Sequence, residues 1–395
     1  MAGSVILAGA RTPIGRLQGS LTGFSGAQLG GLAIKAALER AGVAPDQVDY
    51  VFMGQVLQAG TGQITARQAA ADAGIPMTVP ATTVNKVCLS GLNSIFLADL
   101  LIQAGAAEVV VAGGMESMTK APYLLPGARE GYRLGDRSVV DSMMYDGLFC
   151  AFDQVAMGAG TEKYAASAGL ERGPQDDLAA KSHERAAAAI KEGRFADEIV
   201  PVEVPQRKGD PLVVDTDEGV RPGTTVESLG SLRPAFDKAG NITAGNASQI
   251  SDGAAAVIVV SKAAAERLGL GTLGEVVGYG QVAGPDPSLL TQPSRAILAA
   301  LEGAGKSVAD IDLFELNEAF AAVGLASMED LGITDDVVNV NGGAIALGHP
   351  VGMSGTRVAL TLLHELKRRG GGLGAAALCG GGGQGDAILL SVSNN

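Results

Sequence analysis

The chain has 395 residues, among them 57 glycines and no tryptophan, and carries a formal net charge of −13 at pH 7. This length allows about two or three domains with sizeable cores, and the negative charge argues against a nucleic-acid partner because phosphate binding needs a basic surface. The three cysteines are odd in number and widely spaced, which favours free thiols in a reducing compartment, the cytoplasm, over a disulfide framework.

The N-terminus and the apolar segments argue against export and against a membrane partner. The chain begins with a short apolar run at 5–7 and has no basic region followed by a long apolar stretch, so no secretory signal is expected. The most apolar helix candidate, at 95–102, is interrupted by Asp99 and is far shorter than a membrane span.

Short apolar runs alternate with amphipathic stretches along the chain, which is typical of α/β proteins. Parallel sheets buried on both faces are the expected result. In chain order, the expected strands are 5–7, 50–56, 82–87, 108–111, 254–260, 274–282, 313–316, 337–341 and 375–378, and the expected helices are 27–40, 90–103, 176–192, 294–302, 318–329 and 354–369.

An internal repeat indicates duplicated α/β halves. Ser90-Gly91 opens a helix that is followed by an apolar strand and a pair of glycines, and the same order recurs from Ser354-Gly355. Between 119 and 246 the strand-like runs become short and polar, and one clear helix stands out. We expect an N-terminal half at 1–118 with 247–270, an inserted domain at 119–246, and a C-terminal half at 271–395.

Cys88 lies where an expected strand turns into a helix. Free N–H groups and the helix dipole favour an anion there, so the pKa of this thiol is expected to fall from about 8.5 into the range of roughly 3.5 to 7.5, which would make it a nucleophile. The alternative is a buried structural cysteine.

Three further polar residues lie at turns of the chain and are candidates for a catalytic role. His349 is flanked by Gly348 and by a proline, which restricts the preceding backbone and holds the imidazole in place; alternatively it is an ordinary loop histidine. Cys379 ends an apolar strand before a run of glycines, whose N–H groups can approach a ligand as an oxyanion hole requires; alternatively the glycines form a flexible turn. Asn317, taken alone, is better interpreted as a helix cap than as a water ligand.

Four segments of the chain together resemble the active-site motifs of the thiolase family, in order, at the family's spacing and over essentially the whole chain. Further stretches at 54–57, 112–118 and 232–236 also match. The resemblance implies layered α-β-α-β-α architecture with an inserted loop domain that covers coenzyme A. The four motifs are Val-Cys-Leu-Ser-Gly at 87–91, Asn-Glu-Ala-Phe at 317–320, Gly-His-Pro at 348–350 and Cys-Gly-Gly-Gly at 379–382.

The resemblance also implies a reaction: two acetyl-CoA molecules condense reversibly to acetoacetyl-CoA and CoA through an acyl-enzyme. Cys88 would be acylated, and His349 would take its proton. Cys379 would remove the α-proton of the second acetyl-CoA. Asn317 would hold a water that binds one oxyanion together with His349, while the N–H groups of Cys88 and Gly381 would bind the other.

The resemblance places several residues against CoA or its pantetheine arm. Arg221 could form an ion pair with a phosphate group of CoA. The Arg207-Lys208 pair is better interpreted as part of a solvated face, and Cys150 is better interpreted as a structural residue. Short-chain members commonly carry His-Met-Gly where this chain has Ala156-Met157-Gly158, which leaves the acyl-chain preference open. The expected CoA contacts are Leu148, Met157, Arg221, Ser228, Leu232, Phe236, Ala244, Ser248 and Phe320.

Other activities stay open beside this one. The nearest is a 3-ketoacyl-CoA thiolase of broader chain length, acting in fatty-acid or steroid side-chain breakdown. A nucleotide-dependent oxidoreductase is disfavoured, since Gly380, Gly382 and Gly385 satisfy G-x-G-x-x-G but too little chain follows for a helix. A non-catalytic lipid- or CoA-binding protein would not need both cysteines, His349 and Asn317. No metal or redox cofactor is expected, and the family favours a homotetramer, a dimer of dimers.

Overall fold

The computed structural model describes residues 3–393 and has a mixed sheet of ten strands at its centre. Neighbouring strands follow the order β14-β15-β16-β13-β1-β12-β5-β3-β4, and β2 pairs with β12. The strands are β1 (Ser4–Arg11), β2 (Gly15–Arg16), β3 (Tyr50–Gly54), β4 (Ala81–Val84), β5 (Val109–Ser117), β12 (Ser251–Ser261), β13 (Gly274–Ala283), β14 (Leu313–Leu316), β15 (Gly372–Gly380) and β16 (Gln384–Val392).

The sheet shows the duplication that the repeat predicts. β1 and β13 pair at its centre through Val5 and Glu275. Outward from them the orders β12-β5-β3 and β16-β15-β14 correspond, with antiparallel pairs nearest the centre and a parallel pair outside. The prediction of α/β halves is therefore confirmed, but the prediction of parallel sheets is wrong. Apolar runs do not reveal strand direction, which depends on the length and path of the connections.

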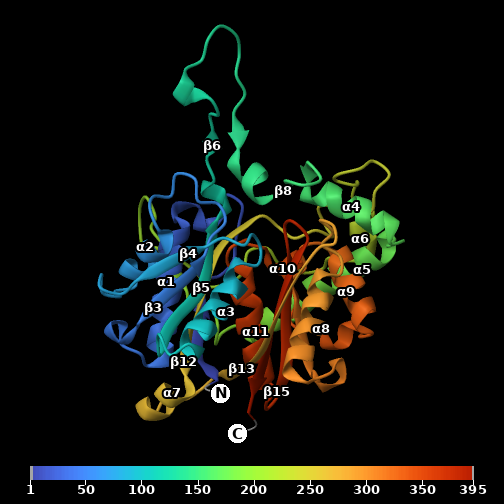
Figure 1. Ribbon diagram of the computed structural model, residues 1–395. Helices are drawn as coiled ribbons and strands as arrows, with labels where there is room; N and C mark the ends of the chain where they lie inside the picture. The colour runs from blue at the N-terminus through green and yellow to red at the C-terminus, as the bar shows by residue number, and fades with distance from the viewer. Residues whose placement is uncertain (1–2, 394–395) are drawn as a thin grey trace.

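Helices cover the sheet in layers (Figure 1). One buried cluster joins α1 and α2 to the first half, another joins α8 and α9 to the second half, and a third places α3 and α11 between residues of both halves. These clusters describe the expected α-β-α-β-α order. The helices are α1 (Gly26–Ala41), α2 (Thr65–Asp72), α3 (Ser90–Gln103), α7 (Lys262–Leu268), α8 (Gln292–Ala304), α9 (Ala321–Leu331), α10 (Ala344–Leu347) and α11 (Ser354–Arg368).

The two central helices meet through the repeated Ser-Gly pairs. A Cβ on Gly91 would lie 2.8 Å from the backbone nitrogen of Thr356, and one on Gly355 would lie 2.2 Å from that of Leu92. Only glycine permits this approach of two backbones. The contact brings the N-termini of α3 and α11 together, and with them the residues that precede each helix.

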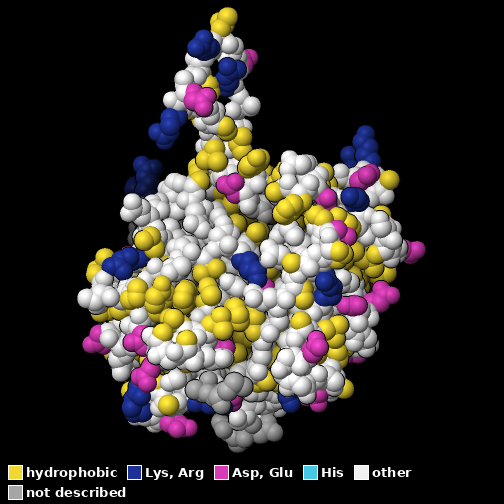
Figure 2. Space-filling model, in the orientation of Figure 1, with side chains coloured by type: hydrophobic (Ala, Val, Ile, Leu, Met, Phe, Trp, Pro, Cys, Tyr) yellow, Lys and Arg dark blue, Asp and Glu magenta, His cyan; other side chains and the backbone are white. Residues whose placement is uncertain are grey.

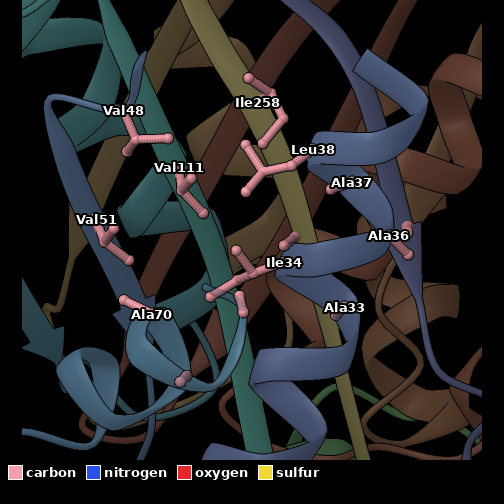
Figure 3. Close-up of a cluster of buried hydrophobic side chains, with 14 of the residues drawn as sticks. Ala33, Ile34, Ala36, Ala37, Leu38, Val48, Val51, Ala70, Val111 and Ile258 are labelled. Carbon is pink, nitrogen blue, oxygen red and sulfur yellow. The ribbon is translucent and has the colours of Figure 1, made fainter. Parts of the chain in front are cut away.

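Alternation along the strands explains how one sheet serves two cores. On β12, Val257 and Val259 belong to the central cluster, while Ile258 and Val260 belong to the outer one. Figure 3 shows Ile258 beside Leu38 of α1, on the outer side of the sheet. The sheet therefore separates an outer core under α1 from the central layer that carries the polar motifs.

Some expected elements differ from the observed ones. The expected strand at 337–341 is a short 3-10 turn, Asp335–Val337, followed by an extended segment, and Val338 forms only an isolated bridge with Phe314. Asn339 takes the place of strand pairing, since its side-chain amide exchanges two hydrogen bonds of 2.8 Å with the backbone of Leu316. The strand expected at 82–87 ends at Val84, because the chain turns there toward Cys88.

The segment between β5 and β12 contributes no strand to the central sheet within the described residues. The helix expected there is α5, and two further helices, α4 and α6, were not expected from the sequence. Buried Arg11 of β1 anchors the segment through Glu198 and Asp217, each at 2.7 Å. The expected domain limits stay a prediction, and residues 1–2 and 394–395 within them lie outside the described range. The elements are β6 (Tyr123–Leu124), β7 (Val140–Asp141), β8 (Phe149–Cys150), β9 (Val155–Ala156), α4 (Met157–Ser167), α5 (Arg172–Lys191), β10 (Val202–Val204), β11 (Leu212–Val214) and α6 (Val226–Gly230).

A long arm built on the β6–β7 hairpin projects from the body of the molecule (Figure 1). It carries hydrophobic side chains among charged ones (Figure 2). Leu134 is fully exposed, and Tyr132 and Val139 are also exposed. No helix among residues 3–393 is both long enough and apolar enough to cross a membrane.

Candidate active site

The four polar motifs come together where the ends of β14 and β15 meet the N-termini of α3 and α11. Because β14 and β15 are parallel neighbours, Asn317 follows one strand beside the last residues of the other, and its N–H donates to the Ala377 carbonyl at 3.0 Å. His349 lies between α10 and α11 and approaches Asn317. Cys379 is the penultimate residue of β15, and Gly381 lies against the Val87 side chain, where its N–H favours the thiolate form of Cys88.

Cys88 follows a strained turn. Val87 has a φ of 50°, which is costly for a β-branched residue. Ser90 holds the turn: its hydroxyl donates to the Val87 carbonyl at 2.6 Å and accepts from the Lys86 N–H at 2.9 Å. The serine of the Ser-Gly repeat thus fixes the backbone on which the partly exposed thiol is carried.

The electrostatics of Cys88 differ from the sequence-based expectation. Burial raises the pKa of this thiol to about 11, and the N–H groups of Cys88 and Gly381 only partly oppose that shift, while the Glu116 carboxylate adds to it. The prediction of a lowered pKa is therefore wrong. A helix N-terminus lowers a thiol pKa when solvent also stabilises the thiolate, and here desolvation outweighs the dipole. The resting side chain is a neutral thiol.

His349 is held at both ring nitrogens. Its Nδ1 lies 2.6 Å from the Ser354 hydroxyl, and that hydroxyl donates its one hydrogen to the Pro350 carbonyl at 3.0 Å. Nδ1 must therefore carry the proton and donate, which leaves Nε2 unprotonated, with a long contact of 3.4 Å to the Asn317 amide nitrogen. Burial, followed by the Arg357 charge, lowers the pKa of His349 to about 3. The ring is neutral at rest and presents Nε2 as a base.

Asn317 does not cap a helix, because α9 begins only at Ala321. Its amide nitrogen lies 3.4 Å from Nε2 of His349. Its carbonyl oxygen is buried and has no hydrogen-bond partner among residues 3–393. An unpaired buried acceptor is costly and indicates a position where a polar ligand atom or a water belongs. The capping interpretation is therefore wrong, and the water-ligand alternative fits this geometry.

Cys379 is almost completely buried beside Ala319 and Leu289. Burial raises the pKa of its thiol well above the usual range, and the neighbouring Cys88 sulfur raises it further. The two sulfurs are thus close enough to influence each other's charge. Neither can ionise at rest without a partner that takes the proton.

Two buried glutamates hold the segment 345–352, the histidine loop, which carries His349. The sequence alone assigned no role to either of them. Glu318 accepts hydrogen bonds from Ser182, Asn339 and the Ile345 N–H at the start of the loop. Glu116 accepts from the Gly352 N–H at its end, at 3.1 Å, and from the backbone of Val56 and Leu57. Burial raises the pKa of Glu116 to about 7. Glutamates inside otherwise apolar or small-residue runs were the signal that could have identified them.

Apolar side chains line the approach to both sulfurs. Leu148 packs in the same cluster as Cys88, and Met157 in the same cluster as Cys379. The Met157 N–H donates to the Leu148 carbonyl at 2.8 Å, so the two expected CoA contacts are adjacent. Ala156, the last residue of β9, immediately precedes Met157.

The remaining expected CoA contacts divide into two groups. The Phe236 ring packs against Gly158 and edge-on to Phe320 at 6.4 Å, and the Ser248 N–H donates to the Ala319 carbonyl, so these side chains adjoin the Met157 region. The other group lies toward the outside of the inserted segment. Ser228 lies in the first turn of α6, where its hydroxyl accepts from the N–H of the N-cap residue Thr225. Leu232 packs on Gly245 beside exposed Ala244, and Arg221 is exposed.

Two other expectations concern cofactors. Within residues 3–393, no group of three His, Cys, Asp or Glu side chains has an arrangement that could hold a metal ion. Gly380 ends β15, Gly382 lies in the turn and Gly385 lies in β16, so these glycines lead into a strand and not a helix and do not form a dinucleotide-binding turn. Cys150 is buried in β8, where its sulfur accepts from the Asp153 N–H at 3.3 Å.

Comparison with known proteins agrees with this geometry. Residues 4–263 match the thiolase N-terminal domain, and residues 270–392 match the thiolase C-terminal domain. A protein of Mycolicibacterium smegmatis named probable acetyl-CoA acetyltransferase is 58% identical over 98% of this chain and 100% of its own length. An acetyl-CoA acetyltransferase of Cupriavidus necator is 52% identical over 98% of each chain. With two domain matches that follow one another along nearly its whole length, the chain belongs to the thiolase family.

Proposed function

We propose that this protein is an acetyl-CoA C-acetyltransferase, which condenses two acetyl-CoA molecules reversibly to acetoacetyl-CoA and CoA. The observation that supports this most is that Gly381 lies against Val87, next to Cys88, so that the backbone N–H groups of Cys88 and of Gly381 both favour negative charge at the Cys88 thiol. A thioester carbonyl attacked by that sulfur would place its oxygen near both donors as negative charge develops. The names of the full-length relatives point to the same reaction.

The first half-reaction forms the acyl-enzyme. Cys88 Sγ attacks the thioester carbonyl as its proton passes to the free Nε2 of His349. The departing CoA thiolate needs a proton, and the neutral thiol of Cys379 supplies it. The site then holds an acyl group on Cys88, an imidazolium and a Cys379 thiolate, so the two charges balance within the buried site.

The second half-reaction uses those charges. The Cys379 thiolate removes the α-proton of a second acetyl-CoA, and the enolate oxygen is stabilised by Nε2–H of His349 and by a water on the Asn317 carbonyl. The enolate carbon attacks the acyl group, the Cys88 thiolate leaves, and the imidazolium returns its proton. Each group ends in its starting protonation state, and no metal or redox cofactor takes part.

Ala156 favours a second candidate, a 3-ketoacyl-CoA thiolase of broader chain length. A methyl group occupies the position before Met157, where an imidazole would leave less room for an acyl chain. The same residues perform condensation and thiolysis, so only the accepted chain length separates the two activities.

We further propose a homotetramer. β4 is an edge strand of the sheet and remains available for pairing with a second copy. Hydrophobic side chains gather around α3 on the same face (Figure 2), with Leu100 exposed and Phe96 half-buried. The arm offers a separate surface through which two such dimers can associate.

The chain-length profile of thiolysis tests the activity. Acetoacetyl-CoA is expected to be cleaved faster than 3-ketoacyl-CoA substrates of eight or more carbons, and Ala156→His is expected to lower the relative rate on the long substrates about tenfold or more by filling space. Initial rates at matched substrate concentrations measure this. A strong preference for long substrates would favour the broader thiolase.

The two cysteines are expected to fail at different steps. Cys88→Ala should abolish the acyl-enzyme and lower turnover on the order of 10⁴-fold or more, because the nucleophile is lost. Cys379→Ala should still accept an acetyl group from acetyl-CoA, more slowly because the departing CoA thiolate must then take its proton from solvent, but should lose condensation. Mass spectrometry of the protein after incubation with acetyl-CoA measures the adduct, with Cys150→Ala as the control. An acetyl group on Cys379 in the wild-type protein would reverse the assignment.

The raised pKa of Cys88 makes its reactivity depend on pH. Because the folded-state pKa is about 11, alkylation by iodoacetamide is expected to accelerate with rising pH and to show no plateau below about pH 10. Peptide mass spectrometry measures the rate at Cys88 alone. A plateau near neutral pH would mean that the resting site holds a thiolate and an imidazolium.

Loss of the apolar side chains of the arm is expected to halve the assembly. Leu134→Asp with Tyr132→Ser should convert a tetramer into a dimer, because an exposed charge cannot be buried in the contact. Light scattering measures the mass, and Leu212→Asp, at an exposed apolar position outside the arm, serves as the control. A wild-type monomer, or an unchanged mass in the double variant, contradicts the proposal.

A further inference from the structure

An ion pair between the two halves lies beside both cysteines. Lys86 Nζ binds Asp386 Oδ1 at 2.7 Å, although the two residues are 300 positions apart. Asp386 is completely buried, and the Lys86 side chain is only 21% exposed. Burial of a carboxylate is costly unless a charge partner and further hydrogen bonds compensate it, so the position of this lysine is constrained.

On the first half, Lys86 belongs to the strained turn that carries the nucleophile. It lies two residues before Cys88, and its own N–H donates to the Ser90 hydroxyl that holds the turn. Val87 between them has the unfavourable φ of 50°. A strained conformation persists only where surrounding contacts fix it, and the Lys86 side chain extends this set of contacts into the other half.

On the second half, Asp386 belongs to the strand pair that carries the second cysteine. In the β15–β16 register, Asp386 faces Leu378, and the next pair is Gly385 with Cys379. Gly381, which lies against Val87 of the nucleophile turn, is in the turn that joins these two strands. A displacement of Lys86 relative to Asp386 would therefore move Cys88 relative to both Cys379 and Gly381.

Asp386 is fixed by a second set of contacts. The Tyr279 hydroxyl donates to its other oxygen at 3.0 Å. The Tyr279 ring stacks on Phe96 of α3, with 4.3 Å between the ring centroids. Asp386 is thus linked to α3, the helix that follows Cys88, through Tyr279 and Phe96, and to the nucleophile turn directly through Lys86. The two sets of contacts together fix the position of that turn.

We propose that Lys86 and Asp386 are positioning residues for this reaction: their ion pair fixes the Cys88 turn of one half against the β15–β16 turn of the other. This role rests on the proposed function and adds to it the contact that aligns the nucleophile with the Gly381 N–H and with Cys379. Neither residue touches the reacting atoms.

Lys86→Met tests the role. It is expected to lower kcat for condensation about 10- to 100-fold, because a misplacement of about 1 Å can cost that much. KM for acetyl-CoA should change less than about threefold, since the Lys86 side chain binds Asp386 and its N–H binds Ser90, neither of which is an expected CoA contact. Lys86→Arg, which keeps the charge, should recover most of kcat. A loss of kcat that Lys86→Arg does not reduce, or a fall confined to KM, would overturn the proposal.

Lys262→Met is the matched control. Lys262 and Glu275 form another ion pair between the halves, but it is half-exposed and lies between α7 and β13. This variant is expected to keep the wild-type kcat. Equal losses in Lys262→Met and Lys86→Met would show that any contact between the halves has the same effect, and would overturn a specific role for Lys86.

The double variant Lys86→Met/Asp386→Asn keeps the test decisive if Lys86→Met alone does not fold, because it removes the unpaired buried charge. It is expected to fold and to retain the loss of kcat. Recovery of wild-type kcat in the double variant would mean that the lysine only neutralises Asp386, and the proposal would be wrong.

Alkylation of Cys88 separates this proposal from the proposed function, since it requires no thiolase activity. If the Gly381 N–H is displaced from the sulfur, the thiolate loses a donor, and iodoacetamide should react several-fold more slowly at each pH in Lys86→Met but not in Lys262→Met. Absence of acetoacetyl-CoA formation by the wild-type protein would refute the activity alone. Unchanged alkylation in Lys86→Met would refute the positioning role alone.

Discussion

The close contact of two glycines, Gly91 and Gly355, is the constraint on which the rest of the site depends. Each glycine lies where any side chain would collide with the backbone of the facing helix, so α3 and α11 approach at their N-termini. Thr356 reinforces the contact through its hydroxyl, which donates to the Gly91 carbonyl at 3.0 Å. The nucleophile of one half and the histidine of the other are neighbours because these helices touch there.

The serines of the same pairs have different tasks, although they occupy equivalent places. Ser90, the first residue of α3, holds the backbone turn that precedes this helix. Ser354, the first residue of α11, accepts a hydrogen bond from Nδ1–H of His349. The Ser-Gly element therefore has a different role in each half. In the first half it holds the strained turn that carries Cys88, and in the second half it orients the imidazole of His349. The two halves have diverged in chemistry while keeping the packing that joins them.

Burial determines the resting charges of the site. It raises the pKa values of both thiols and lowers that of the imidazole, so all three groups are neutral until substrate arrives. In the buried site the His349 imidazolium and the Cys379 thiolate form only as the departing CoA thiolate takes a proton. Each N–H donor then stabilises negative charge more strongly than it would in water. The Glu116 carboxylate, which also holds the histidine loop, further disfavours a resting thiolate at Cys88 by raising its pKa.

The sequence by itself determined the α/β class, the duplication, the thiolase motifs and most strands and helices, because these follow from apolar periodicity, turn residues and local motifs. The expected helix 27–40 is observed as α1, Gly26–Ala41, and Gly42 in a left-handed conformation caps its C-terminus. Only the tertiary structure decided the mixed strand directions and the replacement of strand pairing by the Asn339 side chain. It also decided that Asn317 lies beside His349 without capping a helix, and that the pKa of Cys88 is raised. Each of these depends on contacts between residues far apart in the chain, and desolvation and long-range pairing leave no signature in local sequence.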